Sequence, residues 1–347
     1  MPRTASPRNA SQTPPPPAAR LVRRAERGGD AARQRAAVRA ADHAGTEAAL
    51  VEAPDALTDP VGDARVDAER RRGRGAQSNA SGRYEAEARV AFDDGWQSMD
   101  DLPPFKTQVG IDAARKVITR NDSPDIPFDR SINPYRGCEH GCIYCFARPT
   151  HAYLGLSPGL DFESHLFAKP DAPELLAREL SHPSYQPRMI AIGTNTDPYQ
   201  PIERQYKIMR GILEVLERFG HPVGIVTKSA LVMRDIDILS RMAERQLVKV
   251  GISITTLDPK LARAMEPRAS TPARRLEALS ALARAGVPVM AMVAPVIPAL
   301  NDSEIERILE AVAHAGVREA SYIMLRLPLE VRDLFREWLA ANFPDRY

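Results

Sequence analysis

The sequence predicts an α/β protein whose parallel strands form a partial, six-unit barrel. Apolar segments typical of strands alternate with amphipathic segments typical of helices from about residue 125 onward. The predicted strands span residues 131–136, 188–193, 222–228, 247–254, 287–294 and 320–326. Such alternation indicates parallel strands joined by helical crossovers. Because about eight units close a full barrel, six units indicate an open one, with its site at the carboxyl ends of the strands.

The predicted helices are defined by apolar spacing and by residues that begin or end helices. One helix begins near Ile202 and ends at Gly220, with apolar residues three or four positions apart. Asp258, which precedes a proline, predicts another helix start, because its carboxylate can accept a free backbone N–H. Asn301 and Glu304 resemble a capping box, so we interpret them as the start of a further helix.

The first 85 residues differ in composition from the rest of the chain. A run of prolines at 14–17 and an arginine-rich run at 70–75 lie among small and polar residues, and no aromatic residue precedes Tyr84. Such a segment buries too little apolar surface to offset the entropy lost when its backbone is ordered. We therefore divide the chain into a disordered extension over 1–85, a lead-in segment over 86–124 and a folded core over 125–347.

Composition excludes several classes of protein. The chain has 347 residues, a formal net charge of +2, and no apolar run approaching the length of a membrane span. The net charge gives no indication of a nucleic-acid partner. Because no apolar secretory signal stands at the N-terminus, we expect a cytoplasmic protein without a membrane partner. The 3 cysteines all lie within residues 138–145, a pattern that excludes a disulfide framework.

The cysteines form the motif C-x3-C-x2-C at Cys138, Cys142 and Cys145, directly after the first predicted strand. Gly137 and Gly141 allow the backbone to turn tightly around a bulky ligand. Thiolates are suitable ligands for zinc and for iron–sulfur clusters. Structural zinc usually takes four protein ligands, whereas a four-iron cluster held by three cysteines leaves one iron open to a small molecule. The motif therefore favours a catalytic [4Fe-4S] cluster.

Two other interpretations of the motif remain open at this point. His140 is a candidate fourth ligand for zinc, although its place between two nearby cysteines suits an exposed loop residue better than a tetrahedral site. The main alternative is thus a non-catalytic zinc-binding or scaffolding protein on a degenerate barrel. An electron carrier is a weaker alternative, because three cysteines leave one iron without a protein ligand.

The motif C-x3-C-x-aromatic-C at the end of a first barrel strand resembles the radical S-adenosylmethionine (SAM) superfamily. Residues 131–138 (SINPYRGC) and 193–203 (GTNTDPYQPIE) resemble its branch of spore photoproduct lyase-like and DNA repair photolyase-like proteins. The resemblance covers residues 72–347. It implies that SAM chelates the open iron and is cleaved reductively to a 5′-deoxyadenosyl radical, which takes a hydrogen atom from a substrate. It also implies an electron donor that is flavodoxin-like or ferredoxin-like.

The resemblance also assigns cofactor-binding roles to individual residues. Tyr144 matches the aromatic residue beside the adenine, and Lys228 matches a lysine that meets the SAM carboxylate. Ser253, at the end of the fourth strand, lies where ribose and carboxylate contacts are expected. The groups that match the ligands of the SAM amino nitrogen carry side-chain oxygens, and they are Thr194, Asn195, Thr196 and Asp197. No residue is assigned a catalytic role.

One residue of the spore photoproduct lyase pattern is missing. That enzyme uses an additional cysteine as a hydrogen donor, and Thr194 stands at the matching position here. A hydroxyl donates a hydrogen atom far less readily than a thiol, so the thymine-dimer substrate is not carried over. The substrate stays unknown; nucleic acid is one candidate, although no basic run with aromatic residues supports it. Relatives extend further beyond the helix around Leu334, so we expect a core that is short at its C-terminus.

Overall fold

The computed structural model describes residues 64–85, 103–124 and 126–347. Most of the predicted disordered extension, residues 1–63, and much of the predicted lead-in segment, residues 86–102, lie outside the described residues. Within the described part of the chain, no helix has both the length and the apolar character that crossing a membrane requires.

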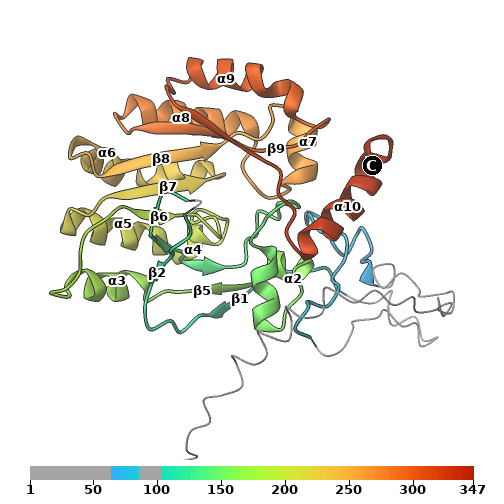
Figure 1. The fold of residues 1–347 in the computed structure, drawn as a ribbon, viewed down its shortest axis with the longest axis horizontal. Helices are drawn as coiled ribbons and strands as arrows, with labels where there is room; N and C mark the ends of the chain where they lie inside the picture. Colours follow the sequence, from blue (N-terminus) through green and yellow to red (C-terminus); the bar gives the residue numbers. More distant parts are fainter. Residues whose placement is uncertain (1–63, 86–102, 125) are drawn as a thin grey trace, which may run out of the picture. The chain divides into compact units, whose positions relative to one another are not determined.

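Seven strands form the main sheet in the order β10-β9-β8-β7-β6-β3-β2 (Figure 1). Their bounds are β2 (Ile118–Arg120), β3 (Arg130–Ile132), β6 (Ile190–Ile192), β7 (Val223–Thr227), β8 (Val248–Ser253), β9 (Val289–Val296) and β10 (Ala320–Met324). All neighbouring strands from β3 to β10 pair in parallel, whereas β2 joins β3 in antiparallel fashion. Each parallel strand lies in or within one or two residues of a predicted range. The predicted α/β class and partial barrel are therefore confirmed.

A second, three-stranded sheet was not predicted. It has the order β1-β5-β4 and is built from β1 (Gln108–Ile111), β4 (Tyr135–Arg136) and β5 (His165–Ala168). None of these strands exceeds 4 residues, which is too short for a clear period in the sequence. Strand β4 contains the last residues of the first predicted strand, and these residues pair with β5 in the second sheet and not with the main sheet. The cysteine motif follows directly after β4.

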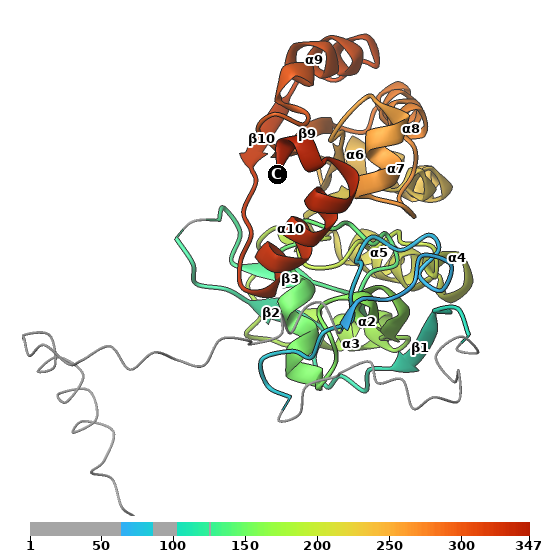
Figure 2. The same ribbon diagram turned by 90° about the vertical axis from the view of Figure 1, so that its right-hand side faces the viewer.

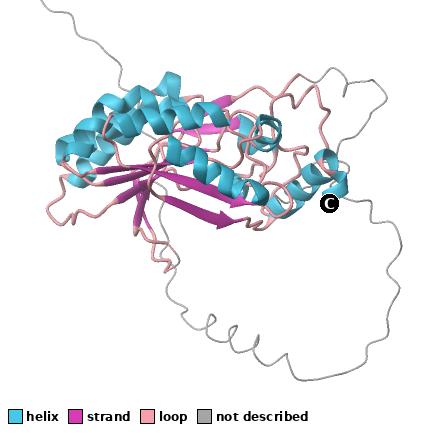
Figure 3. Cartoon of the chain, turned by 90° about the horizontal axis from the view of Figure 1, so that it is seen from above, coloured by secondary structure: helices cyan, strands magenta, loops and turns pink. Residues whose placement is uncertain are grey.

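Helices gather along one side of the strand layer, as Figure 3 shows. The helices of the described residues are α2 (Leu160–Ser164), α3 (Ala172–Leu180), α4 (Glu203–Tyr206), α5 (Ile208–Phe219), α6 (Ile236–Glu244), α7 (Pro259–Met265), α8 (Pro272–Arg284), α9 (Ile305–His314) and α10 (Glu330–Asn342), with the 3-10 helices η2 (Arg148–Leu154), η3 (Ala230–Asp235), η4 (Asp302–Glu304) and η5 (Pro344–Arg346). Asp258 caps α7 as predicted, by accepting a hydrogen bond from the Lys260 N–H at 2.8 Å. The helix predicted from Ile202 to Gly220 is interrupted at Lys207, whose φ of 53° is left-handed.

Asn301 and Glu304 do not form the predicted capping box. The Asn301 amide donates to the carbonyl oxygen of Thr255 at 2.7 Å, and the Glu304 carboxylate accepts from the Leu257 N–H at 2.8 Å. Both side chains therefore join the loop after β9 to the loop after β8. The prediction was wrong because it considered only the helix start, whereas Asn301 bonds to Ile297 and Pro295 before that start and both side chains also bond to residues more than 40 positions away.

The two faces of the main sheet have different surroundings. Ile225 and Val250 are fully buried in the main apolar cluster, together with helix residues such as Leu213 and Leu279. Alternate residues of a strand point to opposite faces, so Val226 points away from that cluster, and it is only half-buried. One face of the sheet thus packs under the helices, and the other is the open side of the barrel.

Ile225→Ala is expected to lower the free energy of unfolding by about 2–5 kcal/mol, because it removes buried apolar surface and leaves a cavity. Val226→Ala, one residue further along the same strand, is the matched control. It is expected to cost about 1 kcal/mol or less, because the lost methyl groups were half-exposed. Urea unfolding followed by circular dichroism measures both values. Equal losses would contradict the assignment of the two faces.

Residues 64–85 are packed, although the sequence analysis placed them in a disordered extension. Arg74 and Ala76 are buried, and the Arg74 guanidinium donates to the carbonyl oxygen of Glu163 at 2.5 Å. The Val66 N–H also donates to the Gln77 carbonyl oxygen at 3.0 Å, so the segment turns back on itself. Composition could not indicate this, because polar partners in distant parts of the chain, and not apolar burial, order the segment.

Candidate cofactor site

The cysteine loop, residues 137–145, follows β4 and carries three free thiols. Cys138 and Cys142 are buried, and Cys145 is partly exposed. Cys145 packs against the apolar cluster of Cys138 and also against that of Cys142. The structure therefore brings the three predicted ligands into one neighbourhood.

The electrostatics of the thiols suit a bound cation. Burial raises the pKa of Cys138 and of Cys142 above the ordinary range, and the nearby carboxylates of Asp197 and Glu266 raise them further. The ammonium of Lys228 acts in the opposite direction on Cys142. A metal centre supplies the positive charge that a buried thiolate otherwise lacks, and it replaces the proton. The buried thiols therefore keep their protons in the metal-free protein, and a bound metal centre would take the place of those protons.

The possible metal ligands on this loop are three thiols. Among the residues that the structure describes, no three His, Cys, Asp or Glu side chains form a site for a single metal ion. In a four-iron cluster each cysteine binds a different iron atom, so the thiols need not converge on one point. Three thiols on one loop match the three-cysteine ligand set of a cluster with one open iron.

Two buried polar side chains hold the backbone of the cysteine loop. Gln200 donates from Nε2 to the Gly137 carbonyl oxygen at 3.1 Å and accepts from the Glu139 N–H at 2.9 Å. Arg148 donates to the carbonyl oxygens of Gly141 at 3.1 Å and of Cys142 at 2.9 Å. Neither side chain was predicted to have a role, because no local pattern in the sequence shows which backbone groups a side chain will contact in the fold.

Tyr144 and Lys228, predicted as separate SAM contacts, lie together. The Lys228 Nζ atom lies 5.7 Å from the centre of the Tyr144 ring, in range of a cation–π interaction. The Tyr144 hydroxyl is hydrogen-bonded to the Glu266 carboxylate, which fixes the orientation of the ring. Lys228 directly follows β7 on the same strand face as half-buried Val226, so this pair stands at the end of the open side of the sheet.

Glu266 and Arg275 form a buried ion pair below Tyr144. Glu266 also accepts a hydrogen bond from the Thr255 hydroxyl at 2.6 Å, and Arg275 donates to the Ser253 carbonyl oxygen at 3.1 Å. Ser253 is itself buried at the end of β8, where the sequence analysis expected a contact with the cofactor. This network connects the cysteine loop to β8, and no motif in the sequence identified Glu266 or Arg275.

Asp197 is surrounded by protein donors. Its two oxygens accept from the Thr227 hydroxyl and from the Lys228 N–H, each at 2.7 Å, and one lies 3.3 Å from His140 Nδ1. Burial by itself would raise the pKa of Asp197, but the charge of His140 and these hydrogen bonds lower it to about 2. His140 is buried, in contrast to the exposed loop residue that the sequence analysis favoured. Asp197 therefore ties the cysteine loop to the end of β7, and its expected contact with SAM stays a prediction.

Thr194 and Asn195 lie after β6, beside Asn133. The Asn133 amide lies 3.5 Å from the Thr194 hydroxyl, and its oxygen accepts from the Asn195 N–H at 3.1 Å. Thr194 is half-buried and Asn195 is exposed, whereas the Thr196 hydroxyl is buried and donates to the Tyr135 carbonyl oxygen at 2.9 Å. Of these neighbours, Thr194 and Asn195 are thus the ones accessible to a ligand.

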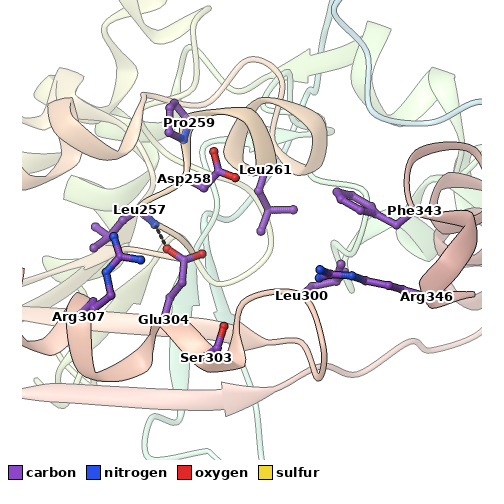
Figure 4. Close-up of a pocket in the computed structure, with 10 residues that line it drawn as sticks. All are labelled: Leu257, Asp258, Pro259, Leu261, Leu300, Ser303, Glu304, Arg307, Phe343 and Arg346. Carbon is purple, nitrogen blue, oxygen red and sulfur yellow. Dashed lines mark hydrogen bonds between the residues drawn. The ribbon is translucent and has the colours of Figure 1, made fainter.

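A separate cavity of about 470 Å³ lies between the loops after β8 and β9 and the C-terminal residues (Figure 4). Its lining residues are Leu257, Asp258, Pro259, Leu261, Leu300, Ser303, Glu304, Arg307, Phe343 and Arg346. Leu261 and Leu300 also belong to the apolar cluster that contains Cys142. None of the predicted site residues lines this cavity, so it is distinct from the cysteine site.

Helix α10 packs against the cysteine loop. Trp338 and Phe335 belong to the same apolar cluster as Cys142 and Tyr144, and the Trp338 indole donates to the Ala264 carbonyl oxygen at 3.0 Å. Figure 2 shows α10 beside α7. The C-terminal helix thus shields one side of the site from water.

His151 is a buried histidine in η2, and its Nε2 donates to the His165 carbonyl oxygen at 2.8 Å. Burial lowers the pKa of His151 from 6.5 to about 4. Between about pH 4 and pH 6.5, His151 therefore carries a proton in the unfolded chain but not in the folded chain. The free energy of unfolding is therefore unaffected by this group above about pH 6.5 and falls by about 3 kcal/mol as the pH drops to 4.

His151→Gln, which keeps a donor for His165, is expected to remove most of this loss. Urea unfolding of the metal-free protein at pH 7 and pH 4.5 measures it. The difference between the two pH values should be smaller in the variant by about 2–3 kcal/mol. An unchanged difference would show that His151 is not the group that titrates.

The open parallel barrel carries three thiols and Tyr144 on one loop, next to Lys228 at the end of β7, an arrangement typical of a cofactor-dependent enzyme class. The family model of the radical SAM superfamily matches residues 132–312, and the chain belongs to this superfamily. The resemblance to this superfamily that the sequence indicated is therefore confirmed. Membership implies an enzyme that uses SAM and an iron–sulfur cluster.

Two relatives are similar over about two thirds of the chain. Uncharacterized protein Rv2578c of Mycobacterium tuberculosis is 40% identical over 222 residues, which are 63% of this chain and 65% of that protein. Uncharacterized protein MJ0683 of Methanocaldococcus jannaschii is 27% identical over 67% of this chain and 83% of that protein. The similarity thus spans less than two thirds of the length of the mycobacterial relative.

Solved structures of spore photoproduct lyase share the fold. One variant of that enzyme, with bound AdoMet and dinucleoside spore photoproduct, matches with a TM-score of 0.51 and 17% identity over 68% of this chain and 66% of that one. Another variant gives a TM-score of 0.50 with 18% identity over the same shares. At this identity the comparison establishes the fold alone.

Proposed function

We propose that this protein binds a [4Fe-4S] cluster through Cys138, Cys142 and Cys145 and cleaves SAM reductively. The observation that carries the proposal is the position of the cysteine loop, whose Tyr144 lies beside Lys228 at the end of β7, on the open side of the barrel. When bound, the reduced cluster supplies the electron that divides SAM into methionine and a 5′-deoxyadenosyl radical.

The residues of this chain bind and orient SAM. Lys228 offers an ammonium to the SAM carboxylate, in a charge-assisted hydrogen bond. Thr194 and Asn195 offer oxygen acceptors to its amino group. The Tyr144 ring, held by Glu266, packs beside the adenine. Ser253, buried at the end of β8, supports the ribose side of the same pocket.

The partner and the compartment follow from this chemistry. Reduction of the cluster requires an electron donor, for which a flavodoxin-like or ferredoxin-like protein is suitable. Free thiols persist in a reducing compartment such as the cytoplasm. The substrate is left unassigned, with nucleic acid as one candidate. Because Thr194 replaces the hydrogen-donating cysteine, the thymine-dimer reaction is not proposed.

Anaerobic reconstitution with iron and sulfide, followed by dithionite and SAM, tests the proposal. The expected result is a brown protein with about four iron atoms per chain that forms 5′-deoxyadenosine. The absence of cluster absorbance or of 5′-deoxyadenosine would refute it. One tightly held zinc ion per chain and no iron, after strictly anaerobic purification, would favour the zinc-binding alternative.

A further inference from the structure

Residues 74–79, here called the strap, lie buried against the cysteine loop. Arg74 donates to the carbonyl oxygen of Phe105 at 2.9 Å and to the Thr107 hydroxyl at 3.0 Å, in addition to its bond with Glu163. Ala76 and Ser78 have no exposed surface. A segment of this composition is disordered by itself, so its burial depends on the specific partners that it meets.

Glu163, in α2, joins the strap to the cysteine loop. Its carboxylate accepts from the Gly75 and Ala76 N–H groups, each at 2.8 Å, and from the Arg148 guanidinium at 2.6 Å. Arg148 is the side chain that also holds two carbonyl oxygens of the loop. Both charges are fully buried, and each is compensated by the other and by these hydrogen bonds.

Gly75 lies in direct contact with the loop backbone. A Cβ atom at Gly75 would stand 2.0 Å from the Gly141 carbonyl oxygen, far inside van der Waals contact. Gly141 itself has a φ of +65°, and a Cβ there would lie 2.7 Å from the Glu163 carboxylate. The two backbones therefore approach each other at glycines, where no side chain fits.

A second connection runs through Thr107. Its hydroxyl, which accepts from Arg74, is hydrogen-bonded to the Glu139 carboxylate next to Cys138. The strap thus acts on the loop near the first cysteine through Thr107 and near the second through Gly75. A loop that is ordered in advance loses less conformational entropy when it binds a ligand.

We propose that the strap is a positioning element that holds the cysteine loop in the conformation required for cluster binding. It acts through the contact of Gly75 with Gly141 and through the Glu163–Arg148 pair. The inference rests on the proposed function, because it concerns the same cluster. Groups that support metal ligands in this way typically contribute about 10- to 100-fold to metal affinity.

The test compares Gly75→Ala with Gly73→Asn in the full-length protein after anaerobic reconstitution. Gly73 lies one position before the strap, with no atom within 4 Å of its Cβ position, and asparagine tolerates its φ of +75°. The readouts are the rate of iron release to excess chelator and the thermal unfolding of the metal-free protein. Gly75→Ala should release iron about 10-fold faster or more, and Gly73→Asn should match the parent.

Parental iron release from a folded Gly75→Ala protein would overturn the inference. Should Gly75→Ala fail to fold, Arg74→Lys decides, because lysine keeps the charge but cannot bond three acceptors in a fork. Accelerated release from that variant, with unchanged thermal unfolding of its metal-free form, supports the strap; parental release rejects it. Failure of the parent to take up a cluster would instead refute the proposed function.

Discussion

Cys142→Ala is expected to abolish cluster binding and SAM cleavage together. Cys142 lies in the centre of the motif, and its side chain is buried against Tyr144 and Leu160. Alanine removes a ligand from one iron, and the chain has no cysteine outside the motif to replace it. Formation of 5′-deoxyadenosine should fall by at least about 1,000-fold, because the reaction has no other source of the electron.

Ile143→Val is the matched control for this prediction. Ile143 is the neighbouring residue, is fully buried and carries no ligand atom. Its truncation is expected to cost about 0.5–1.5 kcal/mol in the free energy of unfolding and to leave the iron content unchanged. Iron and sulfide analysis together with the SAM cleavage assay separates the two variants. Full iron content and activity in Cys142→Ala would contradict the assignment of this thiol as a ligand.

Glu266→Gln is expected to lower the free energy of unfolding by about 3–5 kcal/mol, because it leaves the Arg275 charge buried without a counter-charge. The same change weakens the bond that orients the Tyr144 ring. The KM for SAM should therefore rise by about 10-fold, which corresponds to the loss of one good hydrogen bond.

Glu277→Gln provides the control for the buried pair. Glu277 pairs with Arg274 at 2.5 Å on α8, but both side chains are more than half-exposed. Exposed ion pairs contribute little, so the cost should stay below about 1 kcal/mol and the KM should not change. Urea unfolding and steady-state kinetics measure these effects. Similar losses in both variants would show that burial does not determine the strength of the Glu266 pair.

Local pattern was sufficient to predict the parallel strands and the cysteine motif. Strands β7 (VGIVT) and β8 (VKVGIS) are rich in β-branched apolar residues and end in a polar residue, because one face packs under the helices and the strand ends lie at the edge that carries the site. The three cysteines all lie within residues 138–145, so their proximity could be predicted without knowledge of the fold. The positions of Lys228 and Ser253 followed from the rule that parallel strands end at the same edge.

Long-range contacts decided the rest of the site. Tyr144 meets Glu266 across 122 residues of sequence, and Gly75 meets Glu163 across 88. Such partners are hydrogen-bonding groups whose geometry arises only when the strands and loops have packed, so no periodicity or spacing reveals them. The sequence by itself thus identified the candidate metal ligands and determined which strands carry the candidate site. Only the tertiary structure decided which buried charges and backbone contacts hold those atoms in place.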